Sequence, residues 1–167
     1  MTIGQVNSLD IETFIEKIGW VFEHSPWVAE RTFVGRPFVD RDALHRAMTH
    51  TMMIAAEPEQ LDLLRAHPDL GARARMSTAS VSEQAGAGLD QLTQSEFDDL
   101  IRLNSEYKQK FGFPFLYAVK GSTKCDILAS LTERLHRSRA EEFQEALTQV
   151  TRIAAFRLED LINGTLS

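Results

Sequence analysis

The chain has 167 residues, of which 43% are apolar and 25% charged, and its formal net charge is −6 at pH 7. This is ordinary globular composition, and the length suits a single domain with a sizeable core. The acidic balance argues against bulk binding to nucleic acid or anionic lipid, although one cationic pocket for a small anion remains compatible with it. The single cysteine, Cys125, excludes an intramolecular disulfide and a metal site built from cysteines alone.

Targeting and membrane signals are missing from the sequence. No segment approaches the roughly 18 consecutive apolar residues that cross a bilayer. The start, Met1–Asn7, has neither a basic region nor an apolar run, so we expect no secretory signal. We therefore expect a cytoplasmic protein without a membrane span.

Helix-start signals recur along the chain, whereas alternating strand-like patterns are missing. Pro58 lies in the first turn of a helical pattern, and Ser or Thr stands three residues before Glu or Asp at several helix starts. The capping boxes are Ser80/Glu83, Thr93/Glu96 and Ser138/Glu141, with a weaker one at Thr123/Asp126. Apolar residues then repeat at spacings of three and four. The chain is thus predicted to be all-α, one domain over 1–167 of about eight or nine helices, near 8–19, 27–33, 40–54, 58–66, 69–75, 82–90, 94–109, 123–135 and 139–162.

One apolar segment cannot be a regular helix. Phe111-Gly112-Phe113-Pro114-Phe115 is interrupted by both glycine and proline. We expect a buried irregular loop whose backbone groups need partners. It either presents backbone N–H groups to a ligand or simply fills the space between two helices.

His67 is the strongest candidate for a catalytic residue. Pro68 biases it away from helical geometry, so it is expected at a break just before a helix. The field of a helix N-terminus would lower the pKa of the imidazole and keep it neutral, which suits a general base. The alternative is a histidine that only hydrogen-bonds backbone.

Glu83 and Gln84 follow at the next predicted helix start. They project about 100° apart and can differ in role. Glu83 has a structural alternative as the capping-box partner of Ser80. Gly86 and Gly88 lower helix stability, which close approach of a backbone or a ligand would explain.

Two cations are candidates for holding an anion. Arg157 lies on or beside the apolar face of the last helix, so its guanidinium must reach water or meet an anion. Lys120 follows the apolar segment after Phe115. Other chemistries lack support, because His45 and His50 have the wrong spacing for a helical zinc pair and no phosphate-binding loop occurs.

Taken together, the motifs resemble the family of 2-oxo-4-hydroxy-4-carboxy-5-ureidoimidazoline (OHCU) decarboxylases. The matching pieces occur in the family order over about residues 8 to 162. They are Phe22-Glu23-His24-Ser25-Pro26-Trp27, His67-Pro68-Asp69-Leu70-Gly71, Ser80-x-x-Glu83-Gln84-x-x-Ala87-Gly88-Leu89, Tyr107-Lys108-x-Lys110-Phe111-Gly112-Phe113-Pro114-Phe115 and Arg157-Leu158-x-x-Leu161.

The resemblance implies an all-helical homodimer that converts OHCU to (S)-allantoin and carbon dioxide without metal or organic cofactor. It implies that His67 is catalytic with Glu83 as its acidic companion. The family positions that bind the small ureidoimidazoline substrate fall on Pro68, Ser80, Gln84 and Arg157, with Leu116 and Val119 in the stretch that follows Phe115. Lys120 stands where some members have arginine, and Glu23 is a weaker candidate.

Two other functions remain open from the residues alone. One is a decarboxylase or hydrolase that acts on a related ureido acid. The other is a non-enzymatic helical module that binds a partner through an apolar groove, for which His67, Glu83 and Arg157 would lie on separate surfaces.

Overall fold

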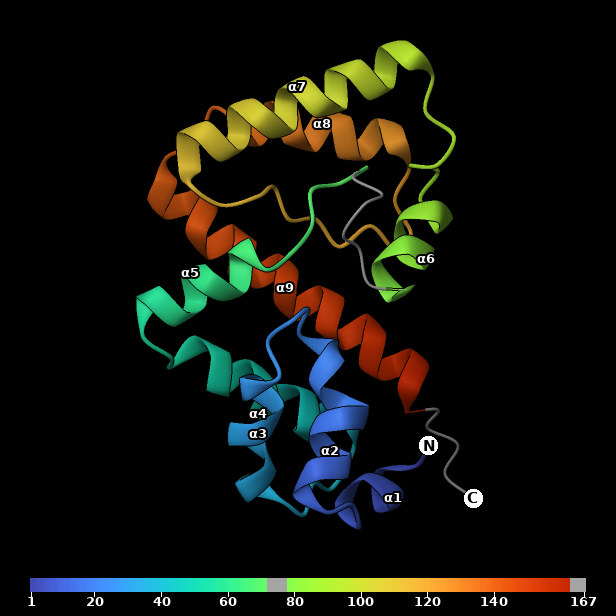
Figure 1. The fold of residues 1–167 in the computed structure, drawn as a ribbon, viewed down its shortest axis with the longest axis vertical. Helices are drawn as coiled ribbons and strands as arrows, with labels where there is room; N and C mark the ends of the chain where they lie inside the picture. The colour runs from blue at the N-terminus through green and yellow to red at the C-terminus, as the bar shows by residue number, and fades with distance from the viewer. Residues whose placement is uncertain (72–77, 163–167) are drawn as a thin grey trace. The chain divides into compact units, whose positions relative to one another are not determined.

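A computed structural model describes residues 1–71 and 78–162, without the side chains of 78–81. Within these residues the fold is all-helical, as predicted, with no strand (Figure 1). The elements are α1 (Ile3–Asn7), α2 (Ile11–Ile18), η1 (Gly19–Val21), α3 (Trp27–Thr32), η2 (Phe33–Gly35), α4 (Arg41–Met53), α5 (Glu57–Arg65), α6 (Thr78–Gly86), α7 (Gln94–Phe111), α8 (Lys124–Arg134) and α9 (Arg139–Leu161).

The chain divides into two compact units. The first comprises Met1–Ala66 together with the chain from Thr151 onward, and the second comprises His67–Val150. Helix α9 contributes its first half to the second unit and its second half to the first. Each unit therefore combines segments that are distant in sequence.

The core of the first unit is built from the predicted apolar stripes. Phe14 and Ile18 of α2 are fully buried, as are Leu44, Met48 and Met52 of α4. Helix α3 contacts both α2 and α4. Burial of these side chains is the main free-energy term that holds the short helices together, because isolated helices of this length are marginal in water.

The core of the second unit is aromatic. Helices α7 and α8 run side by side in Figure 1. Tyr107 of α7 packs its ring against Phe111, Phe113 and Phe115, with centroid separations of 4.5, 6.1 and 5.4 Å. These contacts bury the irregular segment that follows α7, as the sequence predicted.

The helix caps confirm three of the four predicted boxes. Thr93 and Thr123 cap α7 and α8, each with the reciprocal bond from residue N3. The Ser138 hydroxyl accepts from the Glu141 N–H, and the Glu141 carboxylate accepts from the Ser138 N–H. The box at Ser80 is wrong, because α6 begins at Thr78 and Ser80 already lies inside it.

Three predicted helices differ from the structure. The predicted helix 8–19 is shorter in the structure, because α2 begins only after Asp10, whose carboxylate accepts from the Thr13 N–H, and the preceding helix α1, which ends before Ser8, was not predicted. The predicted helix 69–75 is wrong at its start: residues 69–71 form a loop and turn, and 72–75 lie outside the described residues. Helix α6 spans 78–86 rather than 82–90.

Candidate functional site

His67 lies in a turn that follows helix α5. Its side chain is 7% exposed, and Ala66 is the C-cap of α5. Residues 66–71 contain no helix, so the helix start expected at residue 69 does not occur within the described part of this segment. The predicted break at His67-Pro68 is confirmed, because the chain leaves the helical conformation after α5.

Gln84 of α6 joins the turn of His67 directly. Its Oε1 accepts a hydrogen bond from the Gly71 N–H at 2.8 Å. Asn104 of α7 donates to the neighbouring Leu70 carbonyl at 2.9 Å, and Lys108 forms an exposed ion pair with Asp69 at 3.2 Å. The turn is thus hydrogen-bonded to α6, the next helix in the chain, and to α7, which lies further along the sequence.

Two further candidates, Glu83 and Ser80, and two glycines lie on or just after α6. Glu83 is partly buried and adjoins Gln84, so it lies one residue from a group that contacts the turn of His67. Ser80 lies in α6, and its side chain is outside the described residues. No described atom lies within 4 Å of a Cβ built on Gly86 or Gly88, so a close backbone approach is not found among the described residues, and Gly88 has a φ of +79° just beyond the helix end.

The loop 112–119 is held by side chains rather than by a backbone ladder. Arg134 donates to the Leu116 carbonyl and Gln149 accepts from the Ala118 N–H, both at 2.8 Å. Leu116 and Val119 are 3% and 5% exposed. In the described part of the chain, the N–H groups of Leu116 and Val119 have no acceptor. Loop N–H groups of this kind can receive an anionic or carbonyl oxygen.

A buried polar network supports this loop. Glu142 Oε1 accepts from the Tyr107 hydroxyl at 2.5 Å and from Arg134 Nε at 2.7 Å. Arg134 also stacks over the ring of Phe115, 4.5 Å from its centroid. Burial, reinforced by the bond to Glu142, raises the pKa of the Tyr107 hydroxyl well above its usual range. The network therefore fixes the Arg134 side chain, which donates to the Leu116 carbonyl.

Arg157 meets an anion inside the protein. Its Nη2 lies 2.8 Å from Glu23 Oε2, and the two side chains are 2% and 1% exposed. Nη1 makes longer bonds to the carbonyls of Trp20 and Val21, at 3.3 and 3.4 Å. The structure therefore pairs two of the candidates, and Glu23 orients the guanidinium.

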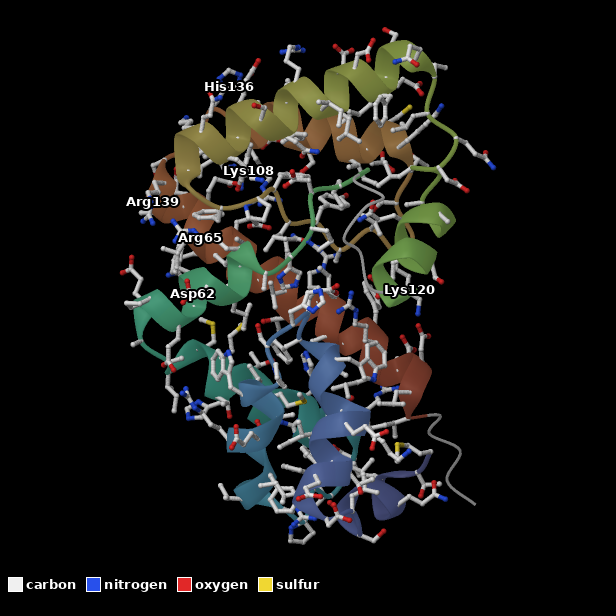
Figure 2. The ribbon with its side chains drawn as sticks, in the orientation of Figure 1. Asp62, Arg65, Lys108, Lys120, His136 and Arg139 are labelled. Atoms are coloured by element: carbon white, nitrogen blue, oxygen red, sulfur yellow. The ribbon has the colours of Figure 1, made fainter. Side chains whose placement is uncertain are left out.

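The remaining candidates lie on loops. Pro68 is partly exposed in the turn of His67. Lys120 is exposed in the turn before α8, and Figure 2 marks its side chain. Of all the candidates, Glu23 and Arg157 belong to the first unit and the others belong to the second.

A groove between α7 and α8 contains none of the candidates. Its apolar lining includes Leu103, Leu128 and Leu135. Among its charged side chains, Arg102 pairs with Asp99 and Glu106. In the residues that the structure describes, no group of three potential metal ligands occurs and no helix is long and apolar enough to span a membrane.

Sequence reasoning missed four buried polar residues that hold the turn and the loop. They are Asn104, Arg134, Glu142 and Gln149, each no more than 4% exposed. A signal for them existed, because each occupies a core-facing position of an apolar helical stripe. Asn104 falls between Leu100 and Tyr107 on α7, where an apolar residue would ordinarily stand.

Comparisons with known proteins agree with the motif resemblance. The sequence profile of the OHCU decarboxylase family matches residues 7–159. An OHCU decarboxylase of Halalkalicoccus jeotgali is 46% identical over 96% of this chain and 92% of its own length. The uric acid degradation bifunctional protein PucL of Bacillus subtilis is 47% identical over 96% of this chain, which spans 33% of that protein. The crystal structure of an (S)-allantoin synthase superposes with a TM-score of 0.78 at 30% identity, over 97% of this chain and 54% of that one. The chain belongs to the OHCU decarboxylase family.

Proposed function

We propose that His67 is the proton-transfer residue of the reaction that this chain catalyses in urate degradation, the decarboxylation of OHCU to (S)-allantoin. The observation that carries this proposal is the bond from the Gly71 N–H to Gln84 Oε1 at 2.8 Å. It brings together two motif segments, His67–Gly71 and Ser80–Leu89, that are separate in sequence. A histidine on a fastened turn, beside a helix with a carboxylate, suits directed proton transfer.

The chemistry defines what each group does. Breaking the bond between the ring carbon and the carboxylate releases CO2 and leaves an electron pair on the ring. The imine and carbonyl of the substrate ring delocalise that pair, so the proposal includes no cofactor. A proton must then reach the carbon from one face. We assign that transfer to His67, with Glu83 fixing the imidazole tautomer and stabilising its charged form.

Anion placement is the second task. Arg157, oriented by Glu23, is the proposed anchor for the substrate carboxylate. The N–H groups of Leu116 and Val119, with Lys120 after them, are proposed to receive oxygen atoms of the substrate. Because Gln84 Oε1 accepts from Gly71, the side of its amide that can face a ligand is the Nε2 donor. Ser80 and Pro68 complete the proposed substrate contacts.

The wider properties belong to the same proposal. The whole chain is proposed to work as one catalytic domain, as a cytoplasmic homodimer. Light scattering of the purified protein tests the dimer. The alternative activity, on a related ureido acid, is tested by offering a panel of such acids beside OHCU.

The decisive experiment uses freshly generated OHCU. Enzymic turnover is followed by circular dichroism, because spontaneous decay in achiral water favours neither face of the ring carbon. We expect the His67→Ala variant to lose the stereospecific signal. The control is His136→Ala, which should keep the signal, because His136 is an exposed histidine in the groove between α7 and α8 (Figure 2). Wild-type turnover by His67→Ala would refute the assignment of His67.

A further inference from the structure

One peptide group in the turn of His67 is held at both of its polar ends. The carbonyl of Leu70 accepts from Asn104 Nδ2 at 2.9 Å, and the N–H of Gly71 donates to Gln84 Oε1 at 2.8 Å. These two groups belong to the same peptide bond, which is planar and rigid. Two side-chain amides from two helices therefore fix the orientation of a single peptide plane, three residues after His67.

Helix α7 also restricts the turn sterically. Gly71 has a φ of +79°, and a Cβ built there would lie 2.8 Å from Leu100 Cδ2. Leu100 and Asn104 are four residues apart and therefore share one face of α7. The same helical face thus gives the turn an apolar wall and a polar anchor.

Asn104 occupies its position at a cost to stability. The residue is 4% exposed, and its Oδ1 is buried with no hydrogen-bond partner among the described residues. An apolar side chain would avoid this cost, since an unsatisfied buried acceptor destabilises the folded state. The only hydrogen bond that the Asn104 side chain makes in the described structure is the one to the Leu70 carbonyl.

We infer that Asn104 is a positioning residue for His67, acting through the Leu70–Gly71 peptide that it holds together with Gln84. This inference rests on the proposed role of His67. Removing the anchor on one side lets the peptide plane rotate, which displaces the turn that carries His67 and Pro68. Displacement of a catalytic group by about 1 Å can lower the rate roughly 100-fold.

The test is Asn104→Leu, which keeps the approximate side-chain volume and removes the donor. We expect kcat to fall about 10- to 100-fold, with a smaller change in KM and an altered pH profile of kcat. The matched control is Gln60→Leu. Gln60 is 8% exposed, and its Nε2 donates to the carbonyls of Met52 and Met53, both at 3.0 Å, in the first unit. The Gln60→Leu variant loses side-chain amide hydrogen bonds comparable to the one that Asn104 makes, but it should keep the wild-type kcat and the wild-type pH profile of kcat.

Amide hydrogen exchange reports on the peptide itself. In the wild-type protein the Gly71 N–H should exchange as slowly as helix amides, and in Asn104→Leu its protection should fall selectively. Asn104→Ser, whose shorter hydroxyl does not reach the Leu70 carbonyl, replaces Asn104→Leu if the latter does not fold. Wild-type kcat in the variant, equal losses in Gln60→Leu, or unchanged Gly71 exchange would each overturn the inference.

His67→Ala is measured in parallel so that the two proposals can fail separately. If His67→Ala is as active as the wild type, the proposed role of His67 is refuted, and the positioning role of Asn104 loses its basis. An inactive His67→Ala beside an Asn104→Leu variant with wild-type kcat overturns only the positioning role.

Discussion

Replacing Arg157 by methionine separates the structural role of a buried ion pair from its proposed role in substrate binding. Arg157 and Glu23 are 2% and 1% exposed, and their charged atoms lie 2.8 Å apart. In Arg157→Met the Glu23 carboxylate keeps its burial and loses this cation. Because a buried charge without its partner is poorly solvated, the folded state should be strongly destabilised.

The magnitude follows from that geometry. Removing one partner of a buried pair lowers the free energy of unfolding by about 3–5 kcal/mol. The bonds from Arg157 to the Trp20 and Val21 carbonyls are long, at 3.3 and 3.4 Å, and add little. At roughly 2–4 °C per kcal/mol for a chain of this size, Tm should fall by about 6–20 °C.

The assay combines urea unfolding with steady-state kinetics on fresh OHCU. The double variant Glu23→Leu/Arg157→Met should recover most of the lost stability, because an apolar pair replaces the ionic one. It should not recover the KM of the wild type if Arg157 binds the substrate carboxylate. Arg31→Met is the control, since its pair with Glu59 is exposed on both sides and its loss should be much smaller.

Two results would refute this reasoning. A loss of less than about 1 kcal/mol in Arg157→Met would contradict the energetic importance of the buried pair. An unchanged KM in Arg157→Met, or a KM restored by the double variant, would refute the role of Arg157 as the carboxylate anchor.

Two further predictions concern the network beneath the loop 112–119. Because folding raises the pKa of the Tyr107 hydroxyl above its ordinary value of 10.0, the neutral hydroxyl contributes its full stability below pH 10.0. This contribution to the free energy of unfolding is lost as the pH rises further. Urea unfolding between about pH 9 and pH 11 should therefore show a smaller alkaline loss of stability in Tyr107→Phe than in the wild type, and equal losses would contradict this. Arg134→Met leaves the fully buried Glu142 without its closest cation and should lower the free energy of unfolding by about 3–5 kcal/mol. It should also raise KM by releasing the Leu116 carbonyl, and a stable variant with an unchanged KM would count against the network as support for the loop.

The local signals of the sequence were sufficient for most of the fold. A capping box such as Thr93/Glu96 acts over three residues, so it operates wherever the rest of the chain lies. The irregular loop after Phe111 was predictable for the same reason, because Gly112 and Pro114 interrupt a helix by their own geometry.

Local signals failed at the start of α6 and where distant residues decided the backbone. The predicted capping box placed a helix start at Ser80, whereas α6 begins at Thr78. The segment 69–71, predicted as helix, is instead held in a turn by Gln84 and by Asn104, 34 residues after Leu70.

The sequence by itself determined the all-helical class and the family motifs with their candidate residues, because helix caps, apolar periodicity and motif spacing are all local patterns. Only the tertiary structure decided which polar residues hold one another. It paired Arg157 with Glu23, Tyr107 with Glu142 and the Leu70–Gly71 peptide with two side-chain amides. Such pairs carry no local signature, since their stability comes from burial that exists only once distant segments have packed.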